Sequence, residues 1–568
     1  MCSDLQDIWH DTSVVDSKIS LNLAATLVCG SLAVAFWPES WSAWSGGQIV
    51  LSSAMGLCSG LCALSAAGAW REDWLRQWRL RRLMEEGRQR YPARWATDED
   101  FEKAGMFDPV GAPIGLTEDG RALFAPSKGR YKTVHRLITG TTGSAKSSAA
   151  LTQAVMHVAF SSGGASVSMF DPKNGEIASQ CVGPLLRAGI DVEIDDPMDF
   201  SGLPGLVSLN AFEPTIRAVR EGKGYPLLEA RRRSFTLEPE PSDSDRKNLH
   251  WRDGTRRIST WAILNLATHD PRECTPTGVA LLLNDDLAFE EALARDALED
   301  GLHGQLARQV LAFREHNPEH HADFLGTARE RFLIFGEGGP LFGAGARATA
   351  SHSDLKARKI VRFFVLPMKD AQVLAPYTIL QQEAALHALD DAGDRTVHLM
   401  CDEFTNAPNR ALVEQLTHLR SSKVEVTMAC QTLNEVARRF GDKECKTIRS
   451  QSSFFQVMGV TDPDEAKRIS ETLGQEPVIT RGMGEQSRAG GHSANYSISG
   501  KPLMTAGEIL EMPPEQQLIF VDGLPPGRCR KLYQNEISPI GELLDPNRVE
   551  GGKLPPNPKV QIEYGELS

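Results

Sequence analysis

Short apolar runs rich in β-branched and aromatic residues alternate with longer stretches of helical spacing over most of the chain after residue 130. Alternation of this kind is typical of a parallel β-sheet that is covered by helices, so we expect an α/β fold. The predicted strands are Val134–Thr139, Ser166–Asp171, Asp191–Ile194, Ile360–Leu366, Thr396–Cys401, Val424–Cys430, Ser453–Val460 and Gln517–Val521.

This alternation is interrupted in the middle of the chain, where we find only helical patterns. In one of them Ile258, Trp261, Ala262 and Leu266 recur at helical spacing and give one apolar face. We therefore expect an all-α insertion that divides the α/β domain into two parts. The predicted helices are Arg246–Thr268, Thr277–Leu283, Phe289–Leu298, Leu302–Phe313 and Phe324–Phe335. The predicted boundaries are 213–350 for the insertion, and 131–212 with 351–534 for the α/β domain.

The N-terminal region contains two long uncharged segments. Ile19 to Trp37 is uncharged for 19 residues and Ile49 to Trp70 for 22, which is close to the ~20 residues of a membrane-spanning helix. Arginines follow the second segment and place that side in the cytoplasm by the positive-inside rule. The pattern predicts a two-pass transmembrane helical hairpin with the bulk of the chain in the cytoplasm. The predicted ranges are 1–18 for a cytoplasmic N-tail, 19–70 for the hairpin and 71–130 for a juxtamembrane connector.

A buried helical hairpin in a soluble protein is the alternative for residues 19–70, because both segments are rich in Ala, Ser and Gly. Two further segments have little apolar content. Residues 481 to 500 are rich in Gly and Ser, which predicts a mobile loop. From Asn535 the chain mixes Pro with an acidic excess, which predicts a flexible C-terminal tail, 535–568, free to bind a partner.

The first candidate functional motif is a Gly-rich turn after the first predicted strand. The sequence GTTGSAKS lies between that strand and a helix-like stretch, which is the context of a P-loop. Backbone N–H groups of such a turn hold phosphates at a helix N-terminus, and Lys146 reaches the outer phosphates of ATP. The predicted nucleotide-binding residues are Gly140, Thr141, Thr142, Gly143, Ser144, Ala145, Lys146, Ser147 and Ser148.

A second, distal segment completes this site. The apolar strand Val397–Cys401 is followed directly by Asp402 and Glu403. We predict that the Ser147 hydroxyl and Asp402 hold Mg²⁺, and that Glu403 orients the water that attacks the γ-phosphate. A turn combined with a distal acid pair is much more specific than the turn alone, and it predicts ATP hydrolysis.

One position of the loop departs from the usual pattern, which has Gly directly before the Lys. Here Ala145 occupies that position. Its methyl group either crowds the phosphates or is tolerated because the residue is already in a helical conformation. The Ala at this position affects the expected affinity for nucleotide. The side chains that carry the chemistry of the site are still present.

The composition is that of a globular protein. The chain has 568 residues, enough for two or three domains, with 24% charged and 41% hydrophobic residues. A net charge of −13 argues against a protein coated with nucleic acid, but it allows a local DNA-binding channel. The ten cysteines have no metal-ligand spacing with histidines, so we expect reduced, buried thiols of a cytosolic protein.

Several ordered motifs resemble those of the coupling-protein ATPases of type IV secretion and conjugation, the TraG/TraD family. The resemblance extends from the N-terminal hairpin to about Tyr533. The motifs are Asp171–Glu176 (DPKNGE, like the family's DPKGE with Asn174 inserted), Ser208–Asn210 (before Ala211, where the family has Pro), Leu399–Phe404 (like LLLDEF), Ala429–Thr432, Lys501–Thr505 and Gly523–Pro526.

The resemblance implies a RecA-like P-loop motor domain that assembles as a homo-hexamer around a central channel. It further implies a protein of the bacterial inner membrane that docks to inner-membrane subunits of a type IV secretion system. The insertion would receive substrate, and ATP with Mg²⁺ would drive delivery of a relaxase bound to single-stranded DNA, or of protein effectors.

Two residues near the end of the site have two interpretations each. By the resemblance Gln431 senses the γ-phosphate, whereas it could also be an ordinary polar strand end. In ring ATPases of this kind an Arg near the position of Arg420 can enter the neighbouring subunit's site and stabilise the transferring phosphoryl group. The alternative for Arg420 is a helix C-terminal cation. Lys173 and Glu176 are either functional or part of a surface turn.

Three functions therefore remain open at this point. The first is a coupling ATPase for relaxase-bound single-stranded DNA, and the second is a coupling ATPase dedicated to protein effectors. The third is a non-hydrolysing membrane scaffold that recruits cargo, against which Lys146, Ser147, Asp402 and Glu403 argue. Nothing in the sequence separates the first two.

Overall fold

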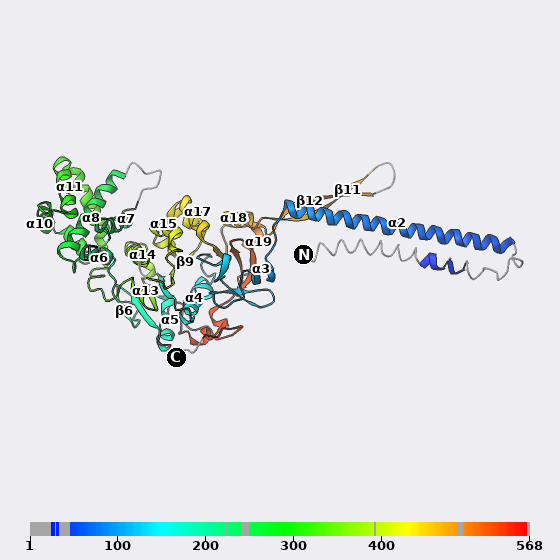
Figure 1. The fold of residues 1–568 in the computed structure, drawn as a ribbon, viewed down its shortest axis with the longest axis horizontal. Coiled ribbons are helices and arrows are strands. Elements are labelled where there is room, and N and C mark those ends of the chain that lie inside the picture. Colours follow the sequence, from blue (N-terminus) through cyan, green and yellow to red (C-terminus); the bar gives the residue numbers. More distant parts are fainter. Residues whose placement is uncertain are drawn as a thin grey trace. The chain divides into compact units, whose positions relative to one another are not determined.

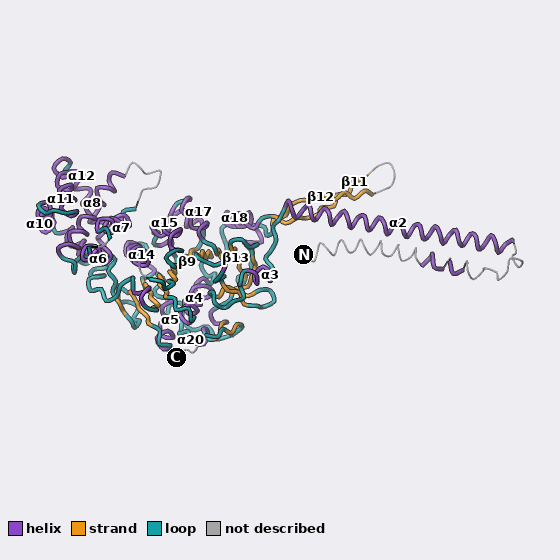
Figure 2. The backbone as a smooth tube through the Cα atoms, in the orientation of Figure 1, coloured by secondary structure: helices purple, strands orange, loops and turns teal. Residues whose placement is uncertain are grey.

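The computed structural model describes residues 24–28, 30–32, 46–222, 224–239, 249–390, 393–485 and 492–564. The chain divides into two compact units, which are described separately (Figures 1 and 2). Unit 1 comprises Met1–Arg94 and Leu473–Leu503, and unit 2 comprises Trp95–Thr472 and Met504–Ser568.

Unit 2 is built on one twelve-stranded sheet with the order β2-β1-β14-β13-β10-β3-β9-β8-β4-β7-β5-β6. From β10 to β6 all neighbouring strands are parallel, and from β10 to β2 all are antiparallel. The sheet is therefore mixed, whereas the sequence predicted a parallel one. The strands are β1 (Pro113–Leu116), β2 (Ala122–Phe124), β3 (His135–Thr139), β4 (Ser166–Asp171), β5 (Asp191–Asp195), β6 (Leu206–Val207), β7 (Ile360–Val365), β8 (Val397–Cys401), β9 (Val424–Cys430), β10 (Phe454–Val457), β13 (Gln516–Val521) and β14 (Gly527–Lys531).

All eight predicted strands are present, and seven of them belong to the parallel part. They were recognisable because helices cover both faces of a parallel sheet, so its strands are continuously apolar. β3 lies between β10 and β9, with Leu137 paired to Phe455 on one side and Met428 on the other. This central position places the turn that follows β3 at the middle of the sheet's carboxyl edge.

Helices follow most of the parallel strands. On one face α4 and α5 share a core with the sheet, in which Val155, Ile177, Met169 and Phe363 are fully buried. The helices of the sheet are α4 (Thr152–Phe160), α5 (Glu176–Arg187), α14 (Ala375–Asp390), α15 (Arg410–Leu419), α16 (Leu433–Phe440), α17 (Asp442–Gln451), α18 (Pro463–Leu473) and α19 (Ala506–Leu510). A single π-helical turn, Ser147–Leu151, precedes α4, and the short α3 (Asp98–Lys103) precedes β1.

A group of helices between β6 and β7 gathers at one end of unit 2 (Figure 1). All five predicted helices are present, and the predicted apolar face is confirmed because Ile258, Trp261 and Ala262 are buried. The group also contains two helices that the sequence analysis missed, α6 and α7. The bounds are α6 (Glu213–Glu221), α7 (Pro226–Leu237), α8 (Leu249–His269), α9 (Pro276–Asn284), α10 (Asp286–Ala297), α11 (Leu302–His316) and α12 (Pro318–Phe332); α13 (Asp354–Ala357) leads into β7.

Unit 1 contains the long helix α2 (Gly46–Arg90). Its part from Val50 onward is the one described helix that is long and apolar enough, by length and composition, to cross a membrane. α2 continues without a break past Trp70, so the predicted second span and the first part of the predicted connector belong to one helix. Residues 24–28 and 30–32 of the first predicted span are also helical, and the Ser59 hydroxyl donates to the Thr26 carbonyl at 3.0 Å. The predicted N-tail, 1–18, lies outside the described residues.

A β-hairpin also belongs to unit 1, where the sequence analysis predicted a mobile loop. Strands β11 (Gln475–Glu485) and β12 (His492–Pro502) pair antiparallel and lie beside the end of α2 (Figure 1). The approach is close: a Cβ at Gly87 would lie 2.8 Å from the Pro477 side chain. Gly500 of the hairpin lies equally close to the residue after the helix, because a Cβ there would lie 2.5 Å from the Tyr91 ring.

The C-terminal segment is likewise structured, contrary to the flexible tail expected for 535–568. It contains β15 (Ile537–Ser538), α20 (Ile540–Leu543) and β16 (Val560–Gln561), and residues through 564 are described. Ile537, Ile540, Leu544, Val560 and Ile562 are buried in the same core as α4 and α5. These apolar residues are too widely spaced among prolines and acids to have given a regular pattern.

Candidate nucleotide site

The Gly-rich turn lies between β3 and the π-helical turn that opens α4, as predicted. Gly140 follows β3, and its N–H donates to the carbonyls of Cys430 and Gln431, each at 3.2 Å. A Cβ at Gly140 would lie 2.4 Å from the Ser144 hydroxyl, so the turn requires glycine there. Gly143 has a positive φ of 81°. The loop therefore closes tightly beside the end of β9.

Ala145 adopts a left-handed backbone conformation, with φ of 68°. The suggestion that it is tolerated through a right-handed helical conformation is therefore wrong. A non-glycine residue in this region costs about 1–2 kcal/mol, because its Cβ approaches the following carbonyl oxygen. Ala145 thus occupies a position whose backbone conformation favours glycine.

Replacing Ala145 with Gly is expected to stabilise the protein. Removing the strain gains about 1–2 kcal/mol, and the entropy of the new glycine in the unfolded chain costs about 0.5–1 kcal/mol. The net gain is about 0–1.5 kcal/mol, so in a chain of this size we expect the melting temperature to rise by at most about 1–2 °C and ATP affinity to be equal or higher. Ala149→Gly, in the π-helical turn four residues later, is the matched control and should lower the melting temperature. An Ala145→Gly variant that melts earlier than wild type would exclude strain at this position.

The predicted acid pair meets the loop. Asp402 and Glu403 follow β8, which is separated from β3 only by β9, and both are buried. The buried Lys146 ammonium donates to the Gly140 carbonyl and lies 3.6 Å from Glu403 Oε1. Glu403 has a positive φ of 43°, a strained conformation of the kind found at functional sites. The structure thus brings Lys146 and both acids together.

Lys173, in the turn after β4, contacts the same acids. Its Nζ lies 3.0 Å from Asp402 Oδ2 and 3.3 Å from Glu403 Oε1. Burial alone would lower the pKa of Lys173, but the charges of Asp402 and Glu403 outweigh it and raise the pKa above its usual value. The surface-turn interpretation of Lys173 is therefore excluded. Its charge compensates two carboxylates that would be costly to bury unpaired.

Glu176, from the same turn, contacts the predicted metal-binding hydroxyl. Ser147 Oγ donates to Glu176 Oε2 at 3.2 Å, and Glu176 Oε1 accepts from Asn547 Nδ2 at 3.2 Å. Burial raises the pKa of Glu176. The Ser147 hydroxyl in the P-loop and the Asp402 carboxylate after β8 are oxygen ligands of the kind that Mg²⁺ prefers. Asn547 shows that the C-terminal segment reaches the site.

Lys531 is a site residue that the sequence analysis missed. It ends β14 with 1% of its surface exposed, and its Nζ donates to the Ser144 carbonyl at 3.0 Å. Burial, assisted by the charge of Lys146, lowers the pKa of Lys531 to about 8, against the opposing charge of Glu515. The only sequence signal was a lysine in a short alternating segment, Gly527–Lys531, which resembles an exposed edge.

Arg420 and Gln431 lie at opposite ends of β9. Gln431 directly follows the strand, and its carbonyl accepts from the P-loop Gly140. Arg420 is exposed, caps α15 at its C-terminus and precedes the start of β9. At about 3.3 Å per residue the strand is roughly 20 Å long, so Arg420 does not reach the site of its own subunit.

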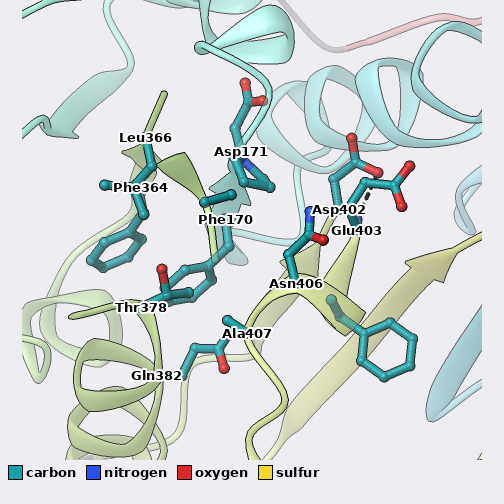
Figure 3. A pocket seen from close by; sticks show the side chains of 13 residues that line it. Phe170, Asp171, Phe364, Leu366, Thr378, Gln382, Asp402, Glu403, Asn406 and Ala407 are labelled. Carbon is teal, nitrogen blue, oxygen red and sulfur yellow. Dashed lines mark hydrogen bonds between the residues drawn. The ribbon is translucent and has the colours of Figure 1, made fainter. Parts of the chain in front are cut away.

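A small pocket lies beside the acid pair (Figure 3). Asp171, Asp402 and Glu403 lie at one side, and the rings of Phe170 and Phe364, stacked at 4.2 Å, lie at the other. Burial raises the pKa of Asp171 to about 7. The apolar wall limits water around the acids and strengthens their electrostatic interactions.

A P-loop on the central strand and a buried acid pair two strands away define a P-loop NTPase fold. Comparison with known families is specific: residues 94–540 match the family described as type IV secretory system conjugative DNA transfer. The chain therefore belongs to this family of type IV coupling proteins, as the sequence motifs suggested.

Two curated relatives carry the name conjugal transfer protein TraG. The one from Rhizobium radiobacter is 28% identical over 134 residues, which is 23% of this chain and 21% of the relative. The one from Agrobacterium fabrum is 28% identical over 113 residues, 19% of this chain and 17% of the relative. The matched segments thus span about a fifth of the length of these relatives.

Solved structures of a bacterial conjugative coupling protein, TrwB, share the fold. The unbound form of TrwBΔN70 superposes with a TM-score of 0.56 at 16% identity, covering 74% of this chain and 89% of that chain. TrwB in complex with ADP and Mg²⁺ gives a TM-score of 0.54 at 16% identity, with 74% and 89% covered. The likeness establishes a RecA-like α/β motor fold with a mixed sheet.

Proposed function

We propose that this protein is an ATPase of the bacterial inner membrane that recruits a relaxase bound to single-stranded DNA and uses ATP hydrolysis for its delivery to a type IV secretion channel. The observation that carries the proposal is the convergence of Lys146, Ser147, Asp402 and Glu403 in a member of the conjugative DNA transfer family. The TrwB structures with ADP and Mg²⁺ and with an ATP analogue support nucleotide binding by the same fold.

Each side chain has a distinct role in this proposal. Residues 140–148 hold the phosphates through backbone N–H groups, and the Lys146 ammonium contacts the outer phosphates. Ser147 and Asp402 are the oxygen ligands for Mg²⁺, which supplies positive charge to the phosphates when bound. The Glu403 carboxylate orients the attacking water and accepts its proton. Gln431, at the edge of the loop, is proposed to sense the γ-phosphate.

The assembly and membrane parts of the proposal rest on the family and on unit 1. We propose that α2 and the helix containing residues 24–28 and 30–32 form a two-pass anchor, and that the subunits form a homo-hexamer. The insertion, 213–350, would receive substrate, and the α/β domain, 131–212 with 351–534, would be the motor. A net charge of −13 does not prevent DNA binding in a channel lined locally by basic groups.

Cargo capture by a hydrolysis-deficient variant tests this function. Glu403→Gln keeps the size of the side chain but cannot accept a proton, so the protein should hold ATP and retain its cargo. Purified from donor cells with the transfer genes, it should carry relaxase and DNA that a single-strand-specific nuclease removes. Glu425→Gln, on β9 outside the site, is the matched control and should carry none. Recovery of effector proteins without DNA would favour the alternative function, a coupling ATPase dedicated to protein effectors.

A further inference from the structure

Two histidines and two carboxylates converge in the helical insertion, far along the chain from the P-loop. His269 ends α8, Asp296 lies in the last turn of α10, Glu299 lies in the turn between α10 and α11, and His303 lies in the first turn of α11. The ligand atoms of His269, Glu299 and His303 all lie within 4.8 Å of one another. The proposed function leaves this cluster without a role.

The distances in the cluster match those between ligands of one metal ion. His303 Nε2 lies 3.0 Å from Glu299 Oε2, and His269 Nε2 lies 3.6 Å from the same oxygen and 3.1 Å from Asp296 Oδ1. A tetrahedral ion with bonds of about 2.0–2.2 Å separates neighbouring ligand atoms by about 3.3–3.6 Å. Only small side-chain movements are therefore needed to bind an ion.

Hydrogen bonds hold the Asp296 carboxylate in an orientation that suits a metal ligand. It is fully buried, and its Oδ2 accepts from Trp261 Nε1 at 3.0 Å and from Asn265 Nδ2 at 2.8 Å. These bonds leave Oδ1 facing His269, and hydrogen bonds of this kind fix the orientation of metal ligands. Arg295 also donates to Oδ1, from Nε at 3.3 Å and from Nη2 at 3.1 Å, and a bound ion would replace this half-exposed ion pair.

We propose that His269, Glu299 and His303 bind one Zn²⁺ ion, with Asp296 Oδ1 at the fourth position. Two imidazoles with carboxylates suit Zn²⁺, whereas the oxygen ligands at the P-loop suit Mg²⁺. The bound ion joins the end of α8 to the α10–α11 turn. Because the unfolded chain has no preformed site, the ion stabilises the folded insertion.

Metal analysis of the purified full-length protein in detergent tests this site. After chelator treatment and dialysis against Zn²⁺, wild type should retain one ion per chain, and Co²⁺ should give the intense visible absorption of a tetrahedral complex. His303→Ala and His269→Ala should lose the absorption and bind Zn²⁺ at least tenfold more weakly. Glu299→Gln preserves a hydrogen-bond acceptor for the histidines, so it should remain folded while also losing affinity.

His316→Ala is the matched control, because His316 is an exposed histidine on the same helix α11 outside the cluster. It should behave as wild type in both measurements. Equal Zn²⁺ retention by wild type and by the His303→Ala and Glu299→Gln variants would overturn the proposal and assign the ion to other groups. Absence of retained Zn²⁺ in the wild type would reduce the cluster to a set of hydrogen bonds.

Discussion

Lys146→Ala is expected to abolish ATP hydrolysis and substrate transfer while leaving the protein folded. Lys146 is buried beside the acid pair, 3.6 Å from Glu403 Oε1, where its charge stabilises the charge that develops on the phosphates. Removing a preorganised charge of this kind lowers kcat by roughly 10²–10³-fold or more. The measurement is the steady-state rate of phosphate release by purified protein, together with transfer efficiency in a mating assay.

A matched lysine distinguishes the effect from a general loss of positive charge. Lys132 precedes β3, pairs with Glu425 at 3.1 Å and is about half exposed. Lys132→Ala should therefore hydrolyse ATP at the wild-type rate. Lys146→Arg should fail as well, because the larger guanidinium does not fit a side chain that is 4% exposed. Hydrolysis by Lys146→Ala at a near wild-type rate is the result that would refute the motor assignment.

Arg420→Ala is expected to lower the hydrolysis rate by about 10³-fold or more with little change in ATP binding. Arg420 is exposed and lies at the opposite end of β9 from the P-loop, so in the proposed hexamer it can act only on the site of a neighbouring subunit. Arginine fingers supplied from outside a site contribute about 10³–10⁵-fold. The effect depends on a planar guanidinium, so Arg420→Lys should not restore the rate.

Mixed assemblies separate this role from helix capping. A cation at a helix C-terminus contributes about 0.3–1 kcal/mol to stability and would not affect the chemical step. Arg420→Ala subunits mixed with Lys146→Ala subunits should regain part of the activity, because some interfaces then contain one intact site and one intact arginine. Arg220→Ala removes another exposed arginine, which lies in the insertion, and should hydrolyse ATP normally. Normal hydrolysis by assembled Arg420→Ala would place the finger elsewhere.

How far the fold can be predicted depends on how each strand is buried. β3, β4 and β7 are buried along their whole length, and the sequence analysis found them within a residue or two. β1 and β14 were not predicted. β1 has only four residues, and in β14 charged positions alternate with buried ones, so neither sequence differs clearly from that of a loop. The consequence is specific: Lys531 was overlooked at the P-loop because its strand was not recognised.

The candidate site was predictable where the order of strand and motif in the sequence determines the positions of the residues. The loop residues and the acid pair follow strands whose carboxyl ends meet, so Lys146, Asp402 and Glu403 come together as predicted. The contacts of Lys173 and Asn547 depend on turns and on a distant segment, and neither spacing nor periodicity reports such contacts. The left-handed conformation of Ala145 is set by closure of the turn, which overrides the preference of the residue.

The position of β13 and β14 in the middle of the antiparallel part has a consequence for translation. They are the last strands of the twelve to leave the ribosome, yet β1 and β2 reach the sheet only through them. A nascent chain therefore already carries Lys146 and the acid pair while the Ser144 carbonyl still lacks the Lys531 ammonium. By then the apolar helix α2 has long emerged. Synthesis order alone thus delays completion of the P-loop contacts until the N-terminal helix has been synthesised.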